Sequence, residues 1–194
     1  MSHLREALGA CVLVGLFLAA GRAPASAIEL VTNGGFETGN FTGWTQSGTP
    51  GAGVASSPFP VHSGSFAAAL GPSGSDGFLS QTLATTPGTT YLVSFWLESD
   101  GLTPNDFSAS WGGTMIFSQD DIPSMSYTDF TFLETATGTS TVLQFGFRND
   151  NGDLGLDDVS VTAAARGGVP EPASLLLLGL GLAAWRLMAV RRRS

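Results

Sequence analysis

Two acidic doublets, Asp120-Asp121 and Asp157-Asp158, are the first candidates for chemistry in this sequence. A pair of carboxyl groups on either side of a glycosidic bond can hydrolyse it. Adjacent residues on a strand point to opposite faces, however, so we expect that neither doublet flanks one bond. Acids from different strands could form such a pair, but nothing in the sequence selects them.

Nucleophilic catalysis has less support. His62 is the only histidine after residue 27, and its His-Ser-Gly setting indicates a turn. No nucleophile-elbow motif is present. The only cysteine, Cys11, lies in a segment that we expect to be removed, which leaves no thiolate and no cysteine metal site. The sequence therefore predicts no catalytic residue and no organic cofactor. A glycan hydrolase with an unusual site is the open alternative.

Aromatic side chains with polar neighbours could instead recognise a sugar. Trp96 and Trp111 are candidate platforms, and Glu98 and Gln144 are candidate polar partners. Trp96 lies opposite the apolar face of its segment, so it is either exposed or packed beneath a loop. The alternative is that the tryptophans belong to the core, as aromatic residues usually do. We expect this for Trp44.

The charge between residues 28 and 168 excludes one class of partner. This segment has fourteen acids, no lysine and two arginines, Arg148 and Arg166, which gives a net charge of −12. Such a surface repels phosphate backbones, so nucleic acid is not an expected partner. It suits an exported soluble domain and divalent cations.

Both ends of the chain read as sorting signals. Residues 1–27 have the order of a secretory signal peptide, with Arg5, an apolar stretch over 7–20 and a cleavage site at Ala25-Ser26-Ala27. At the other end, an apolar run over 173–190 has 18 residues. As a helix it would span about 27 Å, close to the roughly 30 Å of a bilayer core. Three arginines follow at 191–193 and would stay on the cytoplasmic side.

A short motif precedes that run: Val169, Pro170, Glu171 and Pro172. The prolines favour extended backbone, which is the geometry that a protease binds. The motif, the predicted membrane helix and the arginine cluster together resemble the PEP-CTERM sorting tail. That resemblance implies an exported bacterial protein and exosortase as a transient processing partner. The alternative is a permanent single-span membrane anchor.

Between the signals the sequence indicates strands. Alternation of apolar and polar residues is clear over 91–98, 127–134 and 141–147, and weaker over 28–31, 66–70, 78–83, 107–111 and 155–162. We expect an all-β antiparallel sandwich over 28–162, a linker over 163–168 and a sorting tail over 169–194. Asn151-Gly152 favours a β-hairpin turn between the last two strands.

Three blocks carry a second resemblance. They are Asn33-Gly34-Gly35-Phe36-Glu37 with Gly43-Trp44; His62-Ser63-Gly64-Ser65 leading to Pro87-Gly88; and Leu143 to Asp150 ending at Leu156-Asp157-Asp158-Val159. Together they resemble the galactose-binding-like jelly roll, the fold of many carbohydrate-binding modules. The resemblance covers nearly the whole segment between the signals. It implies a jelly-roll fold, and it leaves the ligand open because a fold does not fix a function.

The same resemblance implies a structural calcium ion. The ligand positions are held here by Glu37 and Asp157, with the carbonyl of Gly35 as a third donor. Asp157 is also expected to share a face with Val159 and Val161, and a buried carboxylate needs a partner. Calcium, which prefers oxygen ligands, would serve. Backbone amides or Arg148 are the alternative partners.

We therefore expect an exported, non-catalytic protein of the bacterial cell surface or extracellular matrix. It would be held first in the membrane by its C-terminal helix and would bind carbohydrate such as exopolysaccharide. A purely structural coat or adhesion protein without a small ligand is the second class of function.

Overall fold

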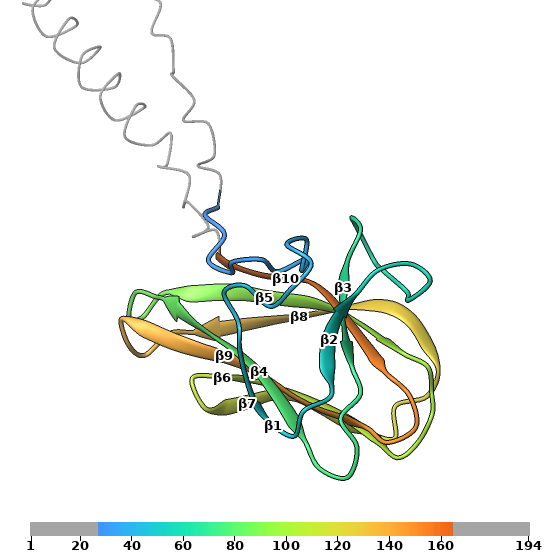
Figure 1. Cartoon of the computed structure of the whole chain (residues 1–194). Coiled ribbons are helices and arrows are strands. Elements are labelled where there is room, and N and C mark those ends of the chain that lie inside the picture. Colours follow the sequence, from blue (N-terminus) through green and yellow to red (C-terminus); the bar gives the residue numbers. More distant parts are fainter. Residues whose placement is uncertain (1–26, 165–194) are drawn as a thin grey trace, which may run out of the picture.

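Ten strands form two antiparallel sheets in the computed structural model, which describes residues 27–164 (Figure 1). The first sheet has the order β1 (Thr45–Gly48), β4 (Gly77–Ala84), β9 (Ser140–Asn149), β6 (Asn105–Trp111) and β7 (Thr114–Asp120). The second has the order β2 (Ala52–Ala55), β3 (Ala67–Leu70), β10 (Leu154–Ala163), β5 (Thr90–Ser99) and β8 (Met125–Thr135).

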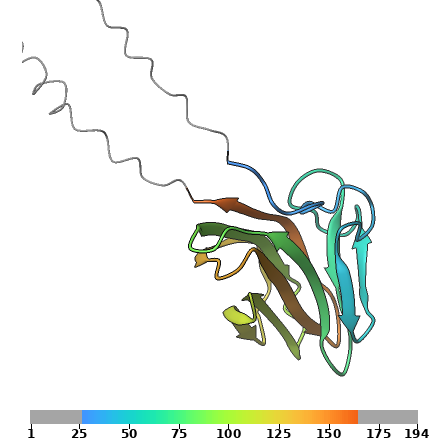
Figure 2. The same cartoon turned by 90° about the vertical axis from the view of Figure 1, so that its left-hand side faces the viewer.

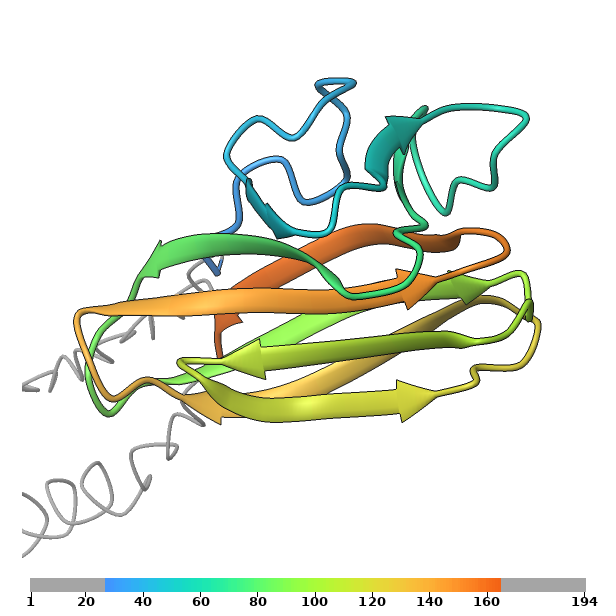
Figure 3. The same cartoon turned by 60° about the horizontal axis from the view of Figure 1, so that its bottom comes forward.

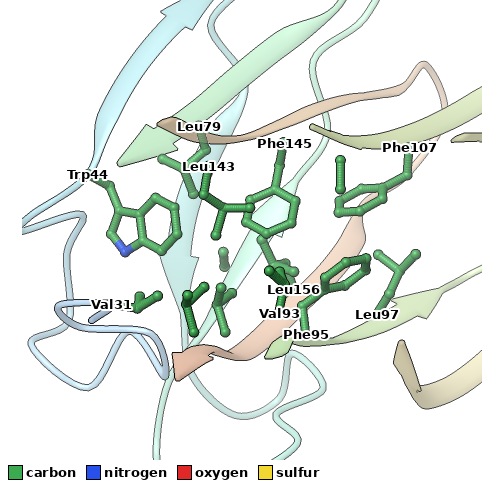
Figure 4. Close-up of a cluster of buried hydrophobic side chains, with 14 of the residues drawn as sticks. Val31, Trp44, Leu79, Val93, Phe95, Leu97, Phe107, Leu143, Phe145 and Leu156 are labelled. Atoms are coloured by element: carbon green, nitrogen blue, oxygen red, sulfur yellow. The ribbon is translucent and has the colours of Figure 1, made fainter. Parts of the chain in front are cut away.

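Regular alternation puts one face of each central strand into the space between the sheets. In β5, Tyr91, Val93, Phe95 and Leu97 are buried, while the residues between them face outward. Aromatic rings fill the middle of this core (Figure 4): the ring centroid of Phe95 lies 5.2 Å from that of Phe145. Trp44 is buried here too, as predicted.

The two ends of the described chain meet. Glu29 bridges Thr162, and the amide of Leu30 donates a hydrogen bond of 3.0 Å to the carbonyl of Val161. Figure 2 shows the first and last described residues near one another. The segment from the first described residue to β3 lies along one side of the sandwich (Figure 3). The chain thus enters and leaves the described domain at the same end.

The sandwich confirms the predicted fold class, with differences in three places. β1, β2 and β7 are additional strands, and their short or irregular burial patterns explain why alternation does not reveal them. The segment 28–31 contributes only one isolated bridge. The turn at Asn151-Gly152 does not close a hairpin, because β9 and β10 belong to different sheets.

The predicted signal peptide, with Ala25, lies outside the described residues apart from Ala27, as do most of the linker and the tail from Val169 onward. Among the residues that the structure describes, no helix is long and apolar enough to cross a membrane.

Candidate functional site

A β-bulge in β10 decides where the second acidic doublet lies. The pairing of β10 with β5 shifts register between Asp157 and Ser160. Asp158 has a φ of 46°, a left-handed conformation that aspartate tolerates better than most residues. The alternation of faces therefore changes within the bulge, so that Leu156 before it and Val159 after it both face the core.

This bulge overturns two predictions that assumed strict alternation. Asp157 does not share the core-facing side with Val159 and Val161, because it precedes the change and lies opposite Trp96 in the neighbouring strand. The two acids of the doublet also do not point to opposite sides, since both accept hydrogen bonds from the same loop. Asp157 is nonetheless fully buried, as predicted, with an exposed fraction of 0%.

The loop over Asp157 is residues 56–66, between β2 and β3, which we call the covering loop. The amides of His62 and Ser63 donate to Oδ2 of Asp157 over 3.0 and 3.2 Å. The amide of Asp158 donates to Oδ1 over 2.7 Å. Backbone amides thus satisfy the carboxylate. Burial raises the pKa of Asp157 to about 6, and these amide bonds oppose the rise without cancelling it.

His62 fastens the covering loop to the outer face of the second sheet. Its Nδ1 lies 2.6 Å from Oδ2 of Asp158, and its ring stacks on Trp96 with centroids 3.7 Å apart. The hydroxyl of Tyr127 donates a 3.2 Å bond to the carbonyl of Pro60. Trp96 therefore takes the second of the two positions predicted for it, packed beneath a loop.

Glu98 follows Trp96 on the same outer face of β5. It lines a hollow of about 240 Å³ together with Pro60, Met125 and Tyr127. Burial raises its pKa to about 7, and the negative charge of Asp100 adds to the rise. Trp96 and Glu98 thus lie side by side, as their spacing predicts, and both are only partly accessible.

Glu37 contacts the end of the covering loop next to β3. Its Oε1 accepts hydrogen bonds from the amides of Ser65 and Phe66 over 2.9 and 3.0 Å. A Cβ added at Gly35 would lie 3.2 Å from Oδ1 of Asp158 and 3.7 Å from Oδ1 of Asp157. Because Gly35 has no side chain, there is space beside it near the carboxylates of Asp157 and Asp158.

Within residues 27–164, no group of three or more His, Cys, Asp or Glu side chains is arranged to hold a metal ion. The two acids named as calcium ligands do approach the same loop, but amide donors occupy them. Arg148 takes no part there: its guanidinium binds Asp150 through Nε and Nη2 and holds the pKa of that carboxyl at about 2.

The other two predicted ligand residues lie elsewhere. Trp111 is buried, with an exposed fraction of 4%, and packs near Tyr91 with ring centroids 5.8 Å apart. It therefore cannot serve as the exposed platform that we predicted, because its ring belongs to the core. Gln144 lies on the outer face of the first sheet, across the sandwich from Trp96. The four residues do not form one site.

The outer face of the first sheet carries an aromatic ring that the sequence analysis does not single out. Phe78 pairs with Ser47 of β1 and Gly146 of β9. A Cβ at Gly146 would lie 3.0 Å from Cε1 of this ring, and one at Gly48 would lie 2.8 Å from Cδ2. Two glycines therefore give the ring room on both of its edges. It borders a hollow of about 250 Å³ with the 46–50 segment.

Polar side chains continue from Phe78 across the sheet. Gln144 of β9 lies between Ser80 of β4 and Ser110 of β6 in register. Ser108 of β6 lies opposite Gly146 on one side and Ser118 of β7 on the other. Hydroxyl and amide groups thus form a row of three on β4, β9 and β6, and a second row of two on β6 and β7. They lie beside one partly exposed aromatic ring, and no loop of the described chain is bonded over them.

Comparisons with known proteins give two family matches. The model described as a carbohydrate binding domain matches residues 29–154, and the model described as a PEP-CTERM protein-sorting motif matches residues 168–193. No curated protein matches the chain. Both resemblances predicted from the sequence are therefore confirmed.

Solved structures share the fold. TmCBM61 in complex with β-1,4-galactotriose has a TM-score of 0.56 and 21% identity, over 71% of this chain and 99% of that one. The K3 cleaved adhesin domain of Lys-gingipain from Porphyromonas gingivalis w83 has a TM-score of 0.54 and 18% identity, over 71% of this chain and 99% of that one. The CBM22-1–GH10 modules of Clostridium thermocellum xylanase 10B, complexed with xylohexaose, have a TM-score of 0.53 and 18% identity, over 71% of this chain and 29% of that one. At these identities the likeness shows the fold alone.

Proposed function

Because the chain belongs to the carbohydrate-binding domain family, we propose that it holds a neutral polysaccharide, without cleaving it, on the outer face of its first sheet. Its PEP-CTERM motif marks it as an exported protein sorted to the cell surface. The binding site for the carbohydrate remains to be assigned. The two outer faces of the sandwich differ in the accessibility of their aromatic and polar side chains.

The single observation that carries the proposal is the setting of Phe78. An aromatic ring beside rows of hydroxyl and amide groups matches the two surfaces of a sugar, whose C–H face is apolar and whose edge is polar. Gly48 and Gly146 keep side chains away from both edges of the ring. Gln144 supplies one acceptor and two donors within the adjacent row.

The second sheet is a poorer candidate because its aromatic residues are already engaged. His62 covers Trp96, and the hydroxyl of Tyr127 is bonded to the covering loop. Glu98 remains beside the hollow there, where it would contact a ligand only at the margin of the loop. We assign Trp96 a structural role and retain Gln144 as a ligand residue.

The negative charge of the domain favours neutral over acidic polysaccharides as ligands. Arg148 is the only arginine or lysine within residues 27–164, and it pairs with Asp150. Asp106 and Asp120 lie opposite each other at one end of the proposed face. A uronic or sulfated polysaccharide would be repelled by these carboxylates, whereas a neutral one would not.

Calcium at the covering loop is a separate part of the proposal. Glu37, Asp157 and the Gly35 carbonyl would hold the ion, supported by the room that Gly35 leaves beside the carboxylates. It would tie the N-terminal segment, the loop and β10 together and would neutralise buried charge. It would take no part in sugar recognition.

For the tail we propose that exosortase cuts near Val169–Ala173 after the apolar run has held the protein in the membrane. Mass spectrometry of the surface or secreted protein tests this. A C-terminus in that range supports cutting, whereas an intact arginine cluster at 191–193 would mean a permanent anchor.

The binding proposal is tested by affinity electrophoresis in gels containing xylan, galactan or an acidic polysaccharide. The full protein should be retarded by a neutral polysaccharide and not by the acidic one. Phe78→Ala should weaken the retardation about tenfold, equivalent to ~1.4 kcal/mol. Phe59→Ala, which removes another partly exposed ring from the covering loop, is the matched control. If Phe78→Ala and Phe59→Ala are retarded equally, the sugar binds elsewhere on the protein. If no neutral polysaccharide retards the natural protein, a structural coat protein is favoured.

A further inference from the structure

The exposed apolar side chains of the described domain are not scattered. Of the six large ones within residues 27–164, five lie at the end where the chain enters and leaves; they are Ile28, Leu92, Met115, Leu133 and Val142. Only Leu102 lies at the opposite end. Single exposed apolar residues are common on soluble proteins, but their collection at one end of a sandwich calls for a cause.

On the second sheet two of these residues are direct neighbours, and polar residues connect them to the third. Leu133 of β8 pairs directly with Leu92 of β5, and Leu92 pairs with Thr162 of β10. Thr162 in turn bridges Glu29, whose neighbour Ile28 is 77% exposed. These residues therefore run across the sheet to the point where the chain begins.

On the first sheet the same end carries Met115 and Val142. Val142 is near the start of β9, and its carbonyl accepts a bond from the amide of Gly112. Met115 is near the start of β7, just after the same turn. We call the five residues on both sheets the apolar rim.

Acidic residues are few at the apolar rim and gather at the other end. Eight of the fourteen acids lie where β5, β7 and β9 end or where β4, β6 and β10 begin; they are Asp76, Glu98, Asp100, Asp106, Asp120, Asp121, Asp150 and Asp153. Near the rim only Glu29 and Glu134 occur within the described chain. The domain therefore has an apolar end and an acidic end.

The sequence that follows the domain indicates which surface lies near its apolar end. Eight residues, 165–172, separate the last described residue from the apolar run that starts at 173. Fully extended they reach about 28 Å, which is less than the ~33 Å from one end of β8 to the other. With the run in a bilayer, the rim is the part of the domain held nearest the lipid.

We propose that the apolar rim rests on the lipid surface of the membrane while the tail is uncut, and that it directs the acidic end outward. Leucine, isoleucine and methionine side chains gain by entering the boundary between headgroups and acyl chains. The acids at the far end stay clear of anionic headgroups. The inference rests on the proposed membrane insertion of the tail.

The test uses residues 28–194, the chain that remains after the predicted signal peptide and its Cys11 are removed, reconstituted in phosphatidylcholine vesicles that contain a lipid with a nitroxide headgroup. A fluorescent label is placed either at Thr135→Cys, beside the rim, or at Ser126→Cys, at the far end of the same strand. Both positions are exposed. Because the labels lie about 30 Å apart along β8, quenching should be several-fold stronger at 135. Leu92→Ser with Leu133→Ser should reduce that difference, and Leu102→Ser, the matched control, should not.

Two failures can be told apart. If the protein floats with the vesicles but both labels are quenched equally, or the double variant changes nothing, the rim does not contact lipid and the inference is wrong, although the tail inserts. If the protein does not float with the vesicles, the tail does not insert, and the inference fails with it.

Discussion

The imidazole of His62 lies flat on the indole of Trp96, with ring centroids 3.7 Å apart and planes inclined by 16°. The same imidazole contacts Asp158, whose neighbour Asp157 is capped by the amides of the covering loop. One histidine thus joins an aromatic contact on β5 to a carboxylate on β10. This contact closes one outer face of the sandwich and leaves the other as the candidate for binding sugar.

Replacing His62 should loosen the covering loop. His62→Ala removes both the stack on Trp96 and the bond to Asp158, and we expect a loss of about 1–2 kcal/mol in the free energy of unfolding. His62→Phe keeps a stacking ring without the bond and should lie between Ala and the natural protein. Urea unfolding measures the loss, and limited proteolysis within residues 56–66 locates it. If all three proteins behave alike, the stack does not fasten the loop.

Stability should fall as the pH rises from about 5 to 8. The folded-state pKa values of Asp157, about 6, and of Glu98, about 7, lie above their unfolded values, mainly because burial penalises the charged forms. The folded protein therefore binds more protons than the unfolded chain between these values, and its advantage is lost as the pH passes through them. Thermal unfolding across this range, in buffer that contains chelator so that no calcium holds Asp157 ionised, measures the effect.

The variant Glu98→Gln should reduce this pH dependence, because the amide cannot titrate. Glu134→Gln, a change of the same type at the other end of the sandwich, is the control and should leave the slope unchanged. A melting temperature that rises between pH 5 and pH 8 would contradict the assignment of these two carboxyls.

Calcium should raise the melting temperature if the proposed ion binds. A ligand at 100 times its Kd stabilises a fold by about 2.7 kcal/mol, which shifts the melting temperature of a domain of this size by roughly 10 °C. We expect that shift between buffers with calcium and with chelator, and we expect Glu37→Gln to abolish most of it. Identical melting curves in both buffers would show that the amides alone satisfy Asp157.

Alternation predicted the fold well because most central strands obey it. The patterns over 91–98 and 141–147 fall within β5 and β9, and their inward residues form the core. It failed at β10, where a bulge breaks the period of two. Leu156 and Val159 are three residues apart and both are buried, and that spacing is the signal from which the bulge could have been inferred.

The candidate site was harder to predict because its parts meet only in the fold. His62 and Trp96 lie on a loop and a strand that no local pattern connects. The room around Phe78 depends on Gly146, which is far along the chain and comes beside it only through the pairing of β4 with β9. Trp111 was misassigned because the outward and inward sides of a short segment look alike in sequence.

The most direct measurement is a nuclear magnetic resonance titration of the protein with xylohexaose and β-1,4-galactotriose. The account predicts chemical-shift changes centred on Phe78, Gln144 and Ser110, on the outer face of the first sheet, and little change at His62 or Trp96. Changes confined to the covering loop and Glu98, or none with either sugar, would contradict it.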